Sequence, residues 1–158
     1  MKCVLQRVTE ARVRVDGETV GSIEGGTCCL LGVLRGDTER EAQRLAERVA
    51  RYRFFADSDG KMNLSALDLG LEVLVISQFT LAADGRRGRR PSFDRAAPPA
   101  VAEPLYEAFC RALERLGLHV ESGRFGAMMR VELVNDGPVT LLLEELPPER
   151  SDQPKSGN

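Results

Sequence analysis

The hydrophobic period of the chain changes at Thr38, and this change limits the chain to folds that combine a sheet with helices. Near the end of residues 2–15, valines alternate with arginines, which is the two-residue period of a half-buried strand. Asp16-Gly17 then predicts a hairpin turn into a second strand over 19–23. Residues 27–34 are almost wholly apolar, so we expect a central strand that is buried on both faces. The chain before Thr38 is therefore predicted to form a sheet.

Two helices are predicted after this point. The first, over 38–53, opens with Thr38-Glu39-Arg40-Glu41, which is a capping box followed by apolar residues at helical spacing. The second is predicted over 99–116, with Gly117 as its C-terminal stop. Pro104 conflicts with a straight helix over that range, so the helix either starts later or bends. The predicted buried stripe of the second helix comprises Val101, Leu105, Phe109, Ala112, Leu113 and Leu116.

Three further strands are predicted, over 71–76, 128–134 and 139–143, and the last two form a final strand pair. This order of elements predicts an α+β domain with a mainly antiparallel, barrel-like sheet and two longer α-helices. We expect a single domain over 1–146. A polar, disordered tail is expected over 147–158.

Composition narrows the classes of function. The chain has 158 residues, of which 42% are hydrophobic and 29% charged, as is typical of a globular domain with a real core. No apolar run approaches the roughly 20 residues that cross a bilayer, and the N-terminus lacks the pattern of a signal peptide. We therefore expect a cytoplasmic protein with no membrane partner. The net charge of −2 argues against indiscriminate nucleic-acid binding.

Metal chemistry is not expected. The four cysteines contain no C-x-x-C pair, and Cys28 and Cys29 are neighbours in an apolar run, where they are interpreted as small buried hydrophobes. His119 is the only histidine. A zinc site would have to be assembled from scattered residues, so we predict neither a metal nor another cofactor.

Two short segments carry hydrogen-bonding groups where apolar strands meet turns. Ser77-Gln78-Phe79-Thr80-Leu81 ends the strand over 71–76, and Asn135-Asp136-Gly137-Pro138-Val139-Thr140 lies between the last two strands. Groups of this kind at the end of a sheet are candidates for holding a ligand. The alternative is structural: the first segment merely closes a strand, and Gly137-Pro138 is a simple turn between antiparallel strands.

Six motifs, found in order along the chain, resemble those of the D-aminoacyl-tRNA deacylases. They are Leu5-Gln6-Arg7-Val8, Asp59-Gly60-Lys61-Met62-Asn63, Ser77-Gln78-Phe79-Thr80-Leu81, Gly88-Arg89-Arg90-Pro91-Ser92-Phe93, Gly123-Arg124-Phe125-Gly126-Ala127-Met128-Met129 and Asn135-Asp136-Gly137-Pro138-Val139-Thr140. The resemblance covers about residues 1–145. It implies hydrolysis of the ester that joins a D-amino acid to the terminal adenosine of tRNA. It also implies a homodimer in which each active site is completed by the neighbouring subunit.

The catalytic candidates are Ser77, Gln78, Phe79 and Thr80. A hydroxyl nucleophile needs a base beside it, and the alternatives are a pair of Ser77 with His119 or direct attack by Thr80 with a carboxylate base. We favour catalysis by the backbone, in which the amides of Phe79 and Thr80 stabilise the oxyanion. Gln78 and Ser77 would hold the loop or the sugar. The substrate's own 2′-hydroxyl would position the attacking water.

The resemblance assigns chiral selectivity to Gly137, Pro138 and Arg7, acting across the subunit boundary. It implies a cis Gly137-Pro138 bond, whose two carbonyls would accept hydrogen bonds from the substrate's α-ammonium while the rigid backbone excludes an L side chain. Glycine has no side chain to exclude, so glycyl-tRNA, including glycine mischarged on tRNA(Ala), is a predicted substrate. Arg7 is expected to brace the Gly-Pro segment.

Two further groups of residues are assigned to the tRNA. Phe125 and Met129 are predicted to form an adenosine pocket, with core packing as the alternative. Arginines in the loop that follows the candidate catalytic segment are predicted to reach tRNA phosphates, with a solvated loop as the alternative. These arginines are Arg86, Arg87, Arg89 and Arg90. The expected partner is thus aminoacylated tRNA, and no DNA partner is expected.

Two rival functions remain at this stage. One is a non-enzymatic module that binds tRNA with the same arginines and leaves the ester intact. The other is a related deacylase with a trans Gly137-Pro138 bond, a wider chiral gate and a preference shifted toward an L-amino acid such as alanine.

Overall fold

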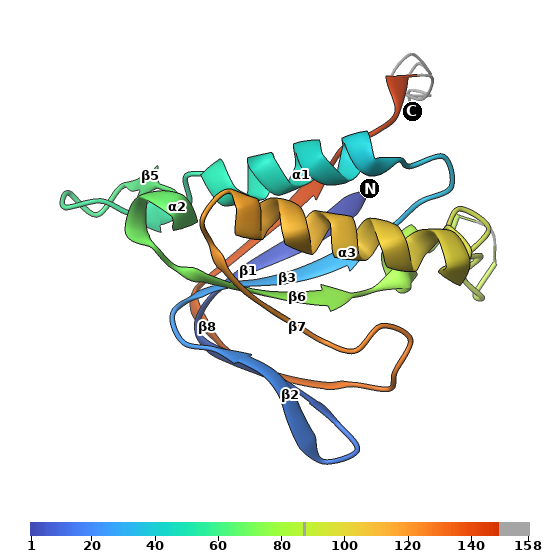
Figure 1. The fold of residues 1–158 in the computed structure, drawn as a ribbon, viewed down its shortest axis with the longest axis horizontal. Helices are drawn as coiled ribbons and strands as arrows, with labels where there is room; N and C mark the ends of the chain where they lie inside the picture. Colours follow the sequence, from blue (N-terminus) through green and yellow to red (C-terminus); the bar gives the residue numbers. More distant parts are fainter. Residues whose placement is uncertain (87, 149–158) are drawn as a thin grey trace.

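Strands form the beginning and end of the fold, and helices lie between them in the chain, as the change of period at Thr38 predicts (Figure 1). The computed structural model describes residues 1–86 and 88–148. The main sheet consists of β1 (Lys2–Val15), β2 (Glu18–Ile23), β3 (Gly26–Gly32), β6 (Glu72–Ser77), β7 (His119–Ser122) and β8 (Arg130–Glu144). A small hairpin consists of β4 (Phe55–Ala56) and β5 (Met62–Leu64). The helices are α1 (Glu39–Arg51), α2 (Ala66–Leu69), α3 (Pro99–Arg115) and the 3₁₀ helix η1 (Phe79–Ala82).

The sheet is mixed, because β1 pairs antiparallel with three strands while the other half is parallel. β1 is long enough to pair with β3 and β2 along one edge and with β8 along the other. β3 pairs parallel with β6, and β6 pairs parallel with β7. Helical crossovers explain the parallel half, since α1 and α2 lie between β3 and β6 in the chain and α3 lies between β6 and β7. The prediction of a mainly antiparallel sheet thus holds for β1 and misses the half that contains β6.

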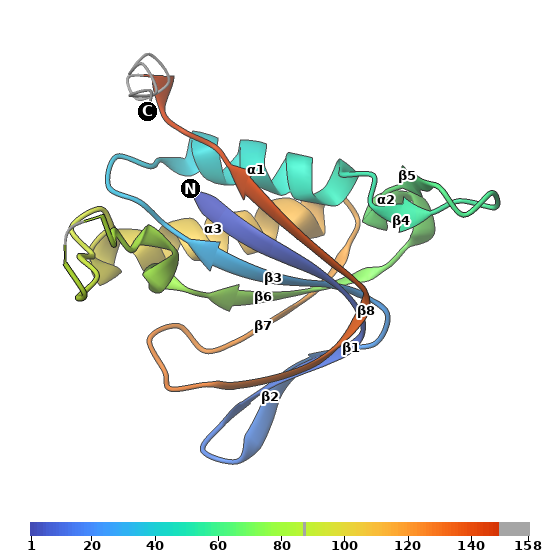
Figure 2. The ribbon, with the colours of Figure 1, turned by 180° about the vertical axis from the view of Figure 1, so that it is seen from behind.

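The sheet curls until it nearly closes into a barrel (Figure 2). Its two ends approach at Gly21 of β2, where an added Cβ would lie only 2.7 Å from the carbonyl oxygen of Ser122 in β7. Glycine at this position therefore allows the backbones of the two end strands to come together.

Both faces of β6 are buried, which explains its continuous apolar run. Val73 and Val75 face the larger core, where α1 and α3 pack on the sheet. Leu74 and Ile76 face a second core inside the curl of the sheet. Two separate cores thus fix the strand that leads into the candidate catalytic segment.

The two long helices lie close to their predicted ranges. The capping box of α1 is confirmed, because the Thr38 amide and hydroxyl both donate to the Glu41 carboxylate while the Thr38 hydroxyl accepts from the backbone. α3 starts at Pro99 and contains Pro104, so the alternative of a later start is wrong. The prediction that Val101 is buried is also wrong, since it is 45% exposed. Its neighbour Ala102 takes the inward position, one residue further along the helix.

The expected pair of final strands is a single strand, β8, and Gly137-Pro138 is not a turn between antiparallel neighbours. β8 stays paired with β1 on both sides of the Gly-Pro segment. The register shifts between Gln6 and Val8 and between Val8 and Glu10, which accommodates the segment as an irregularity within one strand. The length of β1 is the reason, because it offers a partner on both sides of the irregularity.

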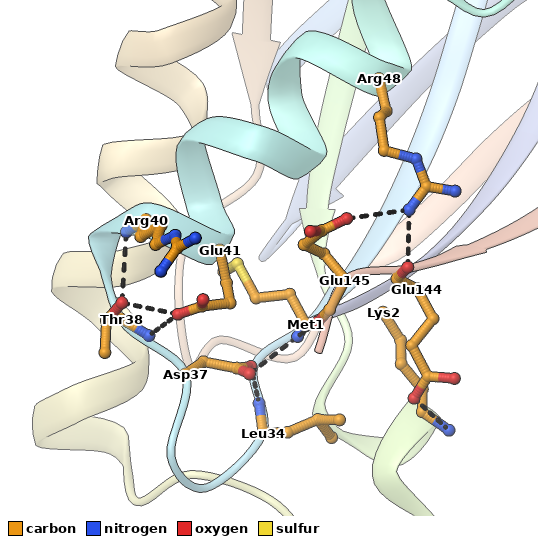
Figure 3. A network of polar contacts seen from close by, with 10 residues as sticks. All are labelled: Met1, Lys2, Leu34, Asp37, Thr38, Arg40, Glu41, Arg48, Glu144 and Glu145. Carbon is orange, nitrogen blue, oxygen red and sulfur yellow. Dashed lines mark hydrogen bonds and ion pairs between the residues drawn. The ribbon is translucent and has the colours of Figure 1, made fainter. Parts of the chain in front are cut away.

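A buried network joins the start of β1, the loop after β3 and the end of β8 (Figure 3). The Met1 ammonium donates to the Glu145 carbonyl at 2.6 Å and lies 2.8 Å from Oδ1 of Asp37, outside hydrogen-bond geometry. The other Asp37 oxygen accepts from the Leu34 amide at 2.6 Å. Desolvation raises the pKa of Asp37, so the contact of its carboxylate with the Met1 ammonium joins these segments at a desolvation cost.

The sequence predictions omit the short strands β4, β5 and β7 and the helix α2. α2 is a short helix with its own capping box at Ser65 and Asp68, and no strand or helix was predicted there. The predicted tail over 147–158 lies outside the described residues, apart from 147 and 148.

Candidate active site

Ser77 is the last residue of β6, and the chain passes from it almost directly into η1. The Gln78 amide donates to the Leu31 carbonyl at 2.7 Å, so β3 holds the turn at the point where β6 ends. The Gln78 side-chain amide donates to the Thr80 hydroxyl. Ser77 and Gln78 are half-buried, whereas Phe79 and Thr80 are exposed. The four predicted catalytic residues therefore form one short segment with its outer half open to solvent.

The backbone amides of Phe79 and Thr80 open η1. The first N–H groups of a helix have no acceptor within the helix, so they are available to an external oxyanion. The Gln78 side chain does not cap them, because it is turned toward Thr80. In ester hydrolysis, neighbouring backbone donors of this kind stabilise the tetrahedral intermediate.

Gly32 is a positioning residue that the sequence analysis missed. A Cβ at this last position of β3 would lie 3.0 Å from both the carbonyl oxygen of Gln78 and the Cβ of Leu81. Glycine therefore lets η1 pack directly on the end of β3. A glycine that ends an apolar strand indicates such a close approach of backbones, and this signal was present in the sequence.

The segment that carries Phe125 and Met129 lies beside the same end of β6. The Gly123 amide donates to the Val75 carbonyl at 3.1 Å, two residues before Ser77. Tyr106 donates to that carbonyl at 2.8 Å, and its ring centroid is 5.9 Å from that of Phe125. Phe125 is half-buried against the larger core.

Met129 is half-buried against the second core. A Cβ at Gly123 would lie 2.6 Å from the Met129 sulfur, so the glycine makes room for this side chain. Phe125 and Met129 therefore pack on different cores, and both side chains keep part of their surface exposed.

The Gly137-Pro138 peptide bond is cis, and both residues are exposed. Arg7 holds the residue before them: its Nε donates to the Asp136 carbonyl at 3.0 Å and lies 3.2 Å from the Asp136 carboxylate. Its Nη1 donates to the Phe54 carbonyl at 2.8 Å. Arg7 thus ties the Gly-Pro segment of β8 to the chain that follows α1.

Within one chain the structure does not bring Gly137-Pro138 to Ser77. The strand pairs can be followed across the sheet from β8 through β1 and β3 to β6. They place the Gly-Pro segment level with the stretch of β6 between Glu72 and Leu74, three to five residues before Ser77. β1 and β3 also lie between β8 and β6. Strand spacings make this roughly 20 Å along the sheet. A single site that uses both segments therefore needs a second copy of the chain.

Within one chain, His119 lies too far from Ser77 to act on it. It pairs with Glu72 at the opposite end of β6, five residues or roughly 16 Å from Ser77. Its Nε2 lies 3.2 Å from the Glu121 carboxylate. The alternative of a Ser77–His119 pair is therefore wrong.

Cys28 and Cys110 are poorly suited to act as nucleophiles. Burial raises the pKa of Cys28 to about 11 and that of Cys110 to about 12, so both stay protonated near neutral pH.

Within residues 1–86 and 88–148, no group of three or more His, Cys, Asp or Glu side chains could hold a metal ion. No helix in the same ranges is long and apolar enough to span a membrane.

The arginine loop follows η1 and is closed by a bridge between Asp84 and Ser92. Arg86 makes a bidentate pair with the Asp84 carboxylate, and this hydrogen bonding lowers the pKa of Asp84. Arg89 and Arg90 are exposed, and no hydrogen bond or ion pair to another described residue engages them. The predicted phosphate ligand Arg87 lies outside the described residues. Of the three predicted phosphate ligands that the structure describes, Arg89 and Arg90 are thus more available than Arg86.

Comparison with known proteins gives a consistent result. The family model described as D-Tyr-tRNA(Tyr) deacylase matches residues 4–144. Three relatives named D-aminoacyl-tRNA deacylase align over 144 residues, or 91% of this chain. The protein of Roseiflexus castenholzii is 61% identical with 92% of its length covered. The protein of Halalkalibacterium halodurans is 60% identical with 99% of its length covered, and that of Thermus aquaticus is 57% identical with 95% of its length covered.

Two solved structures share the fold. One, titled c-Myc DNA Unwinding Element Binding Protein, has a TM-score of 0.86 and 40% sequence identity over 93% of this chain and all of that chain. The other is titled as a structural analysis of a probable eukaryotic D-amino acid tRNA deacylase. It has a TM-score of 0.78 over 90% of this chain and 97% of that chain, and at 17% identity it supports the fold alone.

Proposed function

The chain belongs to the D-Tyr-tRNA(Tyr) deacylase family, and from this membership we propose that the end of β6 is where it hydrolyses the ester of D-aminoacyl-tRNA. The family activity makes the protein a hydrolase that acts on aminoacyl-tRNA. Water adds to the ester carbonyl, and the products are the free D-amino acid and tRNA. The observation that carries the location is the pair of free amides at the start of η1.

In this mechanism the backbone supplies the main catalytic contribution. The amides of Phe79 and Thr80 donate to the developing oxyanion, and one such donor typically lowers the activation barrier by about 3–4 kcal/mol. The 2′-hydroxyl of the terminal ribose positions the attacking water. Gln78 donates to the Thr80 hydroxyl and cannot serve as the base that direct attack by Thr80 would need, which supports a backbone role.

Chiral selectivity is assigned to the Gly137 and Pro138 backbone of a second subunit. The support is that both residues are exposed and that Arg7 fixes the preceding carbonyl, while the same segment is distant from Ser77 within one chain. The two carbonyls would bind the substrate's α-ammonium, and the backbone would leave no space for an L side chain. The protein would then act as a homodimer and also cleave glycine from tRNA(Ala).

The terminal adenosine is assigned to Phe125 and Met129, whose side chains are partly exposed beside the end of β6. An aromatic face and an apolar side chain are suited to a planar base. Arg86, Arg87, Arg89 and Arg90 would contact acceptor-stem phosphates, which position the tRNA without reading its sequence.

The decisive experiment incubates the protein with D-Tyr-tRNA, L-Tyr-tRNA and Gly-tRNA(Ala), with and without a chelator. We expect cleavage of the D-tyrosyl and glycyl esters and no cleavage of the L-tyrosyl ester. Binding without cleavage would favour the non-enzymatic module, and cleavage of both tyrosyl esters would favour the deacylase with relaxed chirality. Loss of activity with the chelator would refute a metal-free mechanism.

A further inference from the structure

Phe79 and Phe93 form an exposed aromatic pair next to the proposed active site. Their ring centroids are 5.2 Å apart with an interplanar angle of 64°. Phe79 is 58% exposed and Phe93 is 36% exposed. The mechanism above uses only the backbone of Phe79, and it does not use Phe93. Two large apolar side chains are therefore open to solvent at the place where the tRNA end would arrive.

Both rings are held by fixed backbone rather than by a free loop. Phe79 begins η1, which is anchored to β3 through the Gln78 amide. Phe93 follows the bridge between Ser92 and Asp84, and its carbonyl accepts from the Ala96 amide at 2.9 Å. The rings meet in a T-shaped arrangement, with the edge of one directed at the other. Both rings of the pair are thus anchored through backbone contacts, and each keeps part of its surface exposed.

The charge around this surface favours nucleic acid. Residues 84–95, which lead into and past Phe93, contain five arginines and two aspartates. Arg89 and Arg90 are exposed without a partner among the described residues. Proteins that hold single-stranded nucleic acid combine aromatic side chains that stack on bases with arginines that follow the backbone.

We propose that the Phe79–Phe93 pair stacks on the base that precedes the terminal adenosine, the unpaired cytosine common to the 3′ ends of tRNAs. This inference rests on the proposed function, because it assumes that the ester lies against the Phe79 amide. Phe93 is then a positioning residue that improves capture of a polynucleotide substrate, and Phe79 contributes through both its backbone and its ring.

The test compares substrates that differ by one nucleotide. D-tyrosyl adenosine, D-tyrosyl cytidylyl-adenosine and D-Tyr-tRNA are hydrolysed by the wild type and by Phe93→Leu, Phe93→Tyr and Tyr52→Leu. Tyr52 is the matched control, because it is an aromatic residue of 39% exposure at the far end of α1. Binding of uncharged cytidylyl-adenosine and of adenosine monophosphate is measured on the same proteins, so the inference is tested without relying on catalysis.

In the wild type we expect kcat/KM to rise by roughly tenfold when cytidine is added to the adenosine ester. Phe93→Leu should lose this gain, whereas Phe93→Tyr and Tyr52→Leu should retain it. The inference is overturned if Phe93→Leu lowers kcat/KM equally for all three substrates or leaves the gain from cytidine intact. It is also overturned if gel filtration shows that Phe93→Leu dissociates a protein oligomer. A wild type that binds cytidylyl-adenosine more tightly than the monophosphate but cleaves no ester would refute the proposed function instead.

Discussion

Replacing Gly32 by alanine should slow hydrolysis by moving η1. The new Cβ would lie 3.0 Å from the Gln78 carbonyl oxygen and from the Leu81 Cβ, whereas ordinary contacts begin near 3.4 Å, so η1 must recede by a few tenths of an ångström. A misplacement of about 1 Å can cost about 100-fold in rate, and a shift of this smaller size is expected to lower kcat about tenfold. KM should change little, because other segments are assigned to the adenosine and phosphates.

Stability provides a second readout of the same change. Overpacking costs about 1–3 kcal/mol, which corresponds to a fall in Tm of about 2–4 °C per kcal/mol for a domain of this size. Gly25→Ala is the control, because a Cβ there meets nothing within 4 Å. The assay is single-turnover hydrolysis of D-Tyr-tRNA together with thermal unfolding. A Gly32→Ala protein with lowered Tm and wild-type kcat would refute the claim that the amides of η1 need this position.

Three further predictions concern stability, charge and thiol chemistry. Gly26→Ala should unfold the protein at ambient temperature, because its Cβ would lie 2.1 Å from the Glu72 carbonyl oxygen; a cooperative, native-like urea transition would contradict this. Arg89→Glu should weaken tRNA binding and reduce its salt dependence more than Arg86→Glu, because Arg86 is already paired with a carboxylate. Filter binding at several salt concentrations measures both effects. Cys110, whose pKa burial raises from 9.0 to about 12, should carry about a thousandfold less thiolate at pH 8 than a free thiol and resist a thiol reagent until urea is added.

Local patterns predicted the elements well, because they depend on neighbouring residues. The capping box at Thr38 and the apolar run of β6 each follow from a few adjacent side chains. The continuity of β8 could not be read in this way, since it depends on the length of β1, more than 100 residues away in the chain. The parallel pairing of β6 likewise follows from how the helices cross the sheet.

The candidate site likewise combines features that adjacent residues predict and features that depend on contacts between distant parts of the chain. Ser77–Thr80 is one continuous segment, so its composition and its place after a strand were visible in the sequence. The contact of Arg7 with Asp136 joins residues 129 positions apart, and only the family resemblance pointed to it. The close approach of Gly32 to η1 had a signal in the sequence, but only the fold shows which backbone it meets.

The long strand β8 has a consequence for solubility. Within the described residues it pairs with β1 alone, and it exposes Val134 and Leu142. An unprotected edge of this length invites strands from other molecules and the growth of fibrils. Pro138 has no N–H to offer an incoming strand, so such a ladder is interrupted halfway along β8. The residue assigned to reading handedness thus also limits how far a foreign strand could pair along β8.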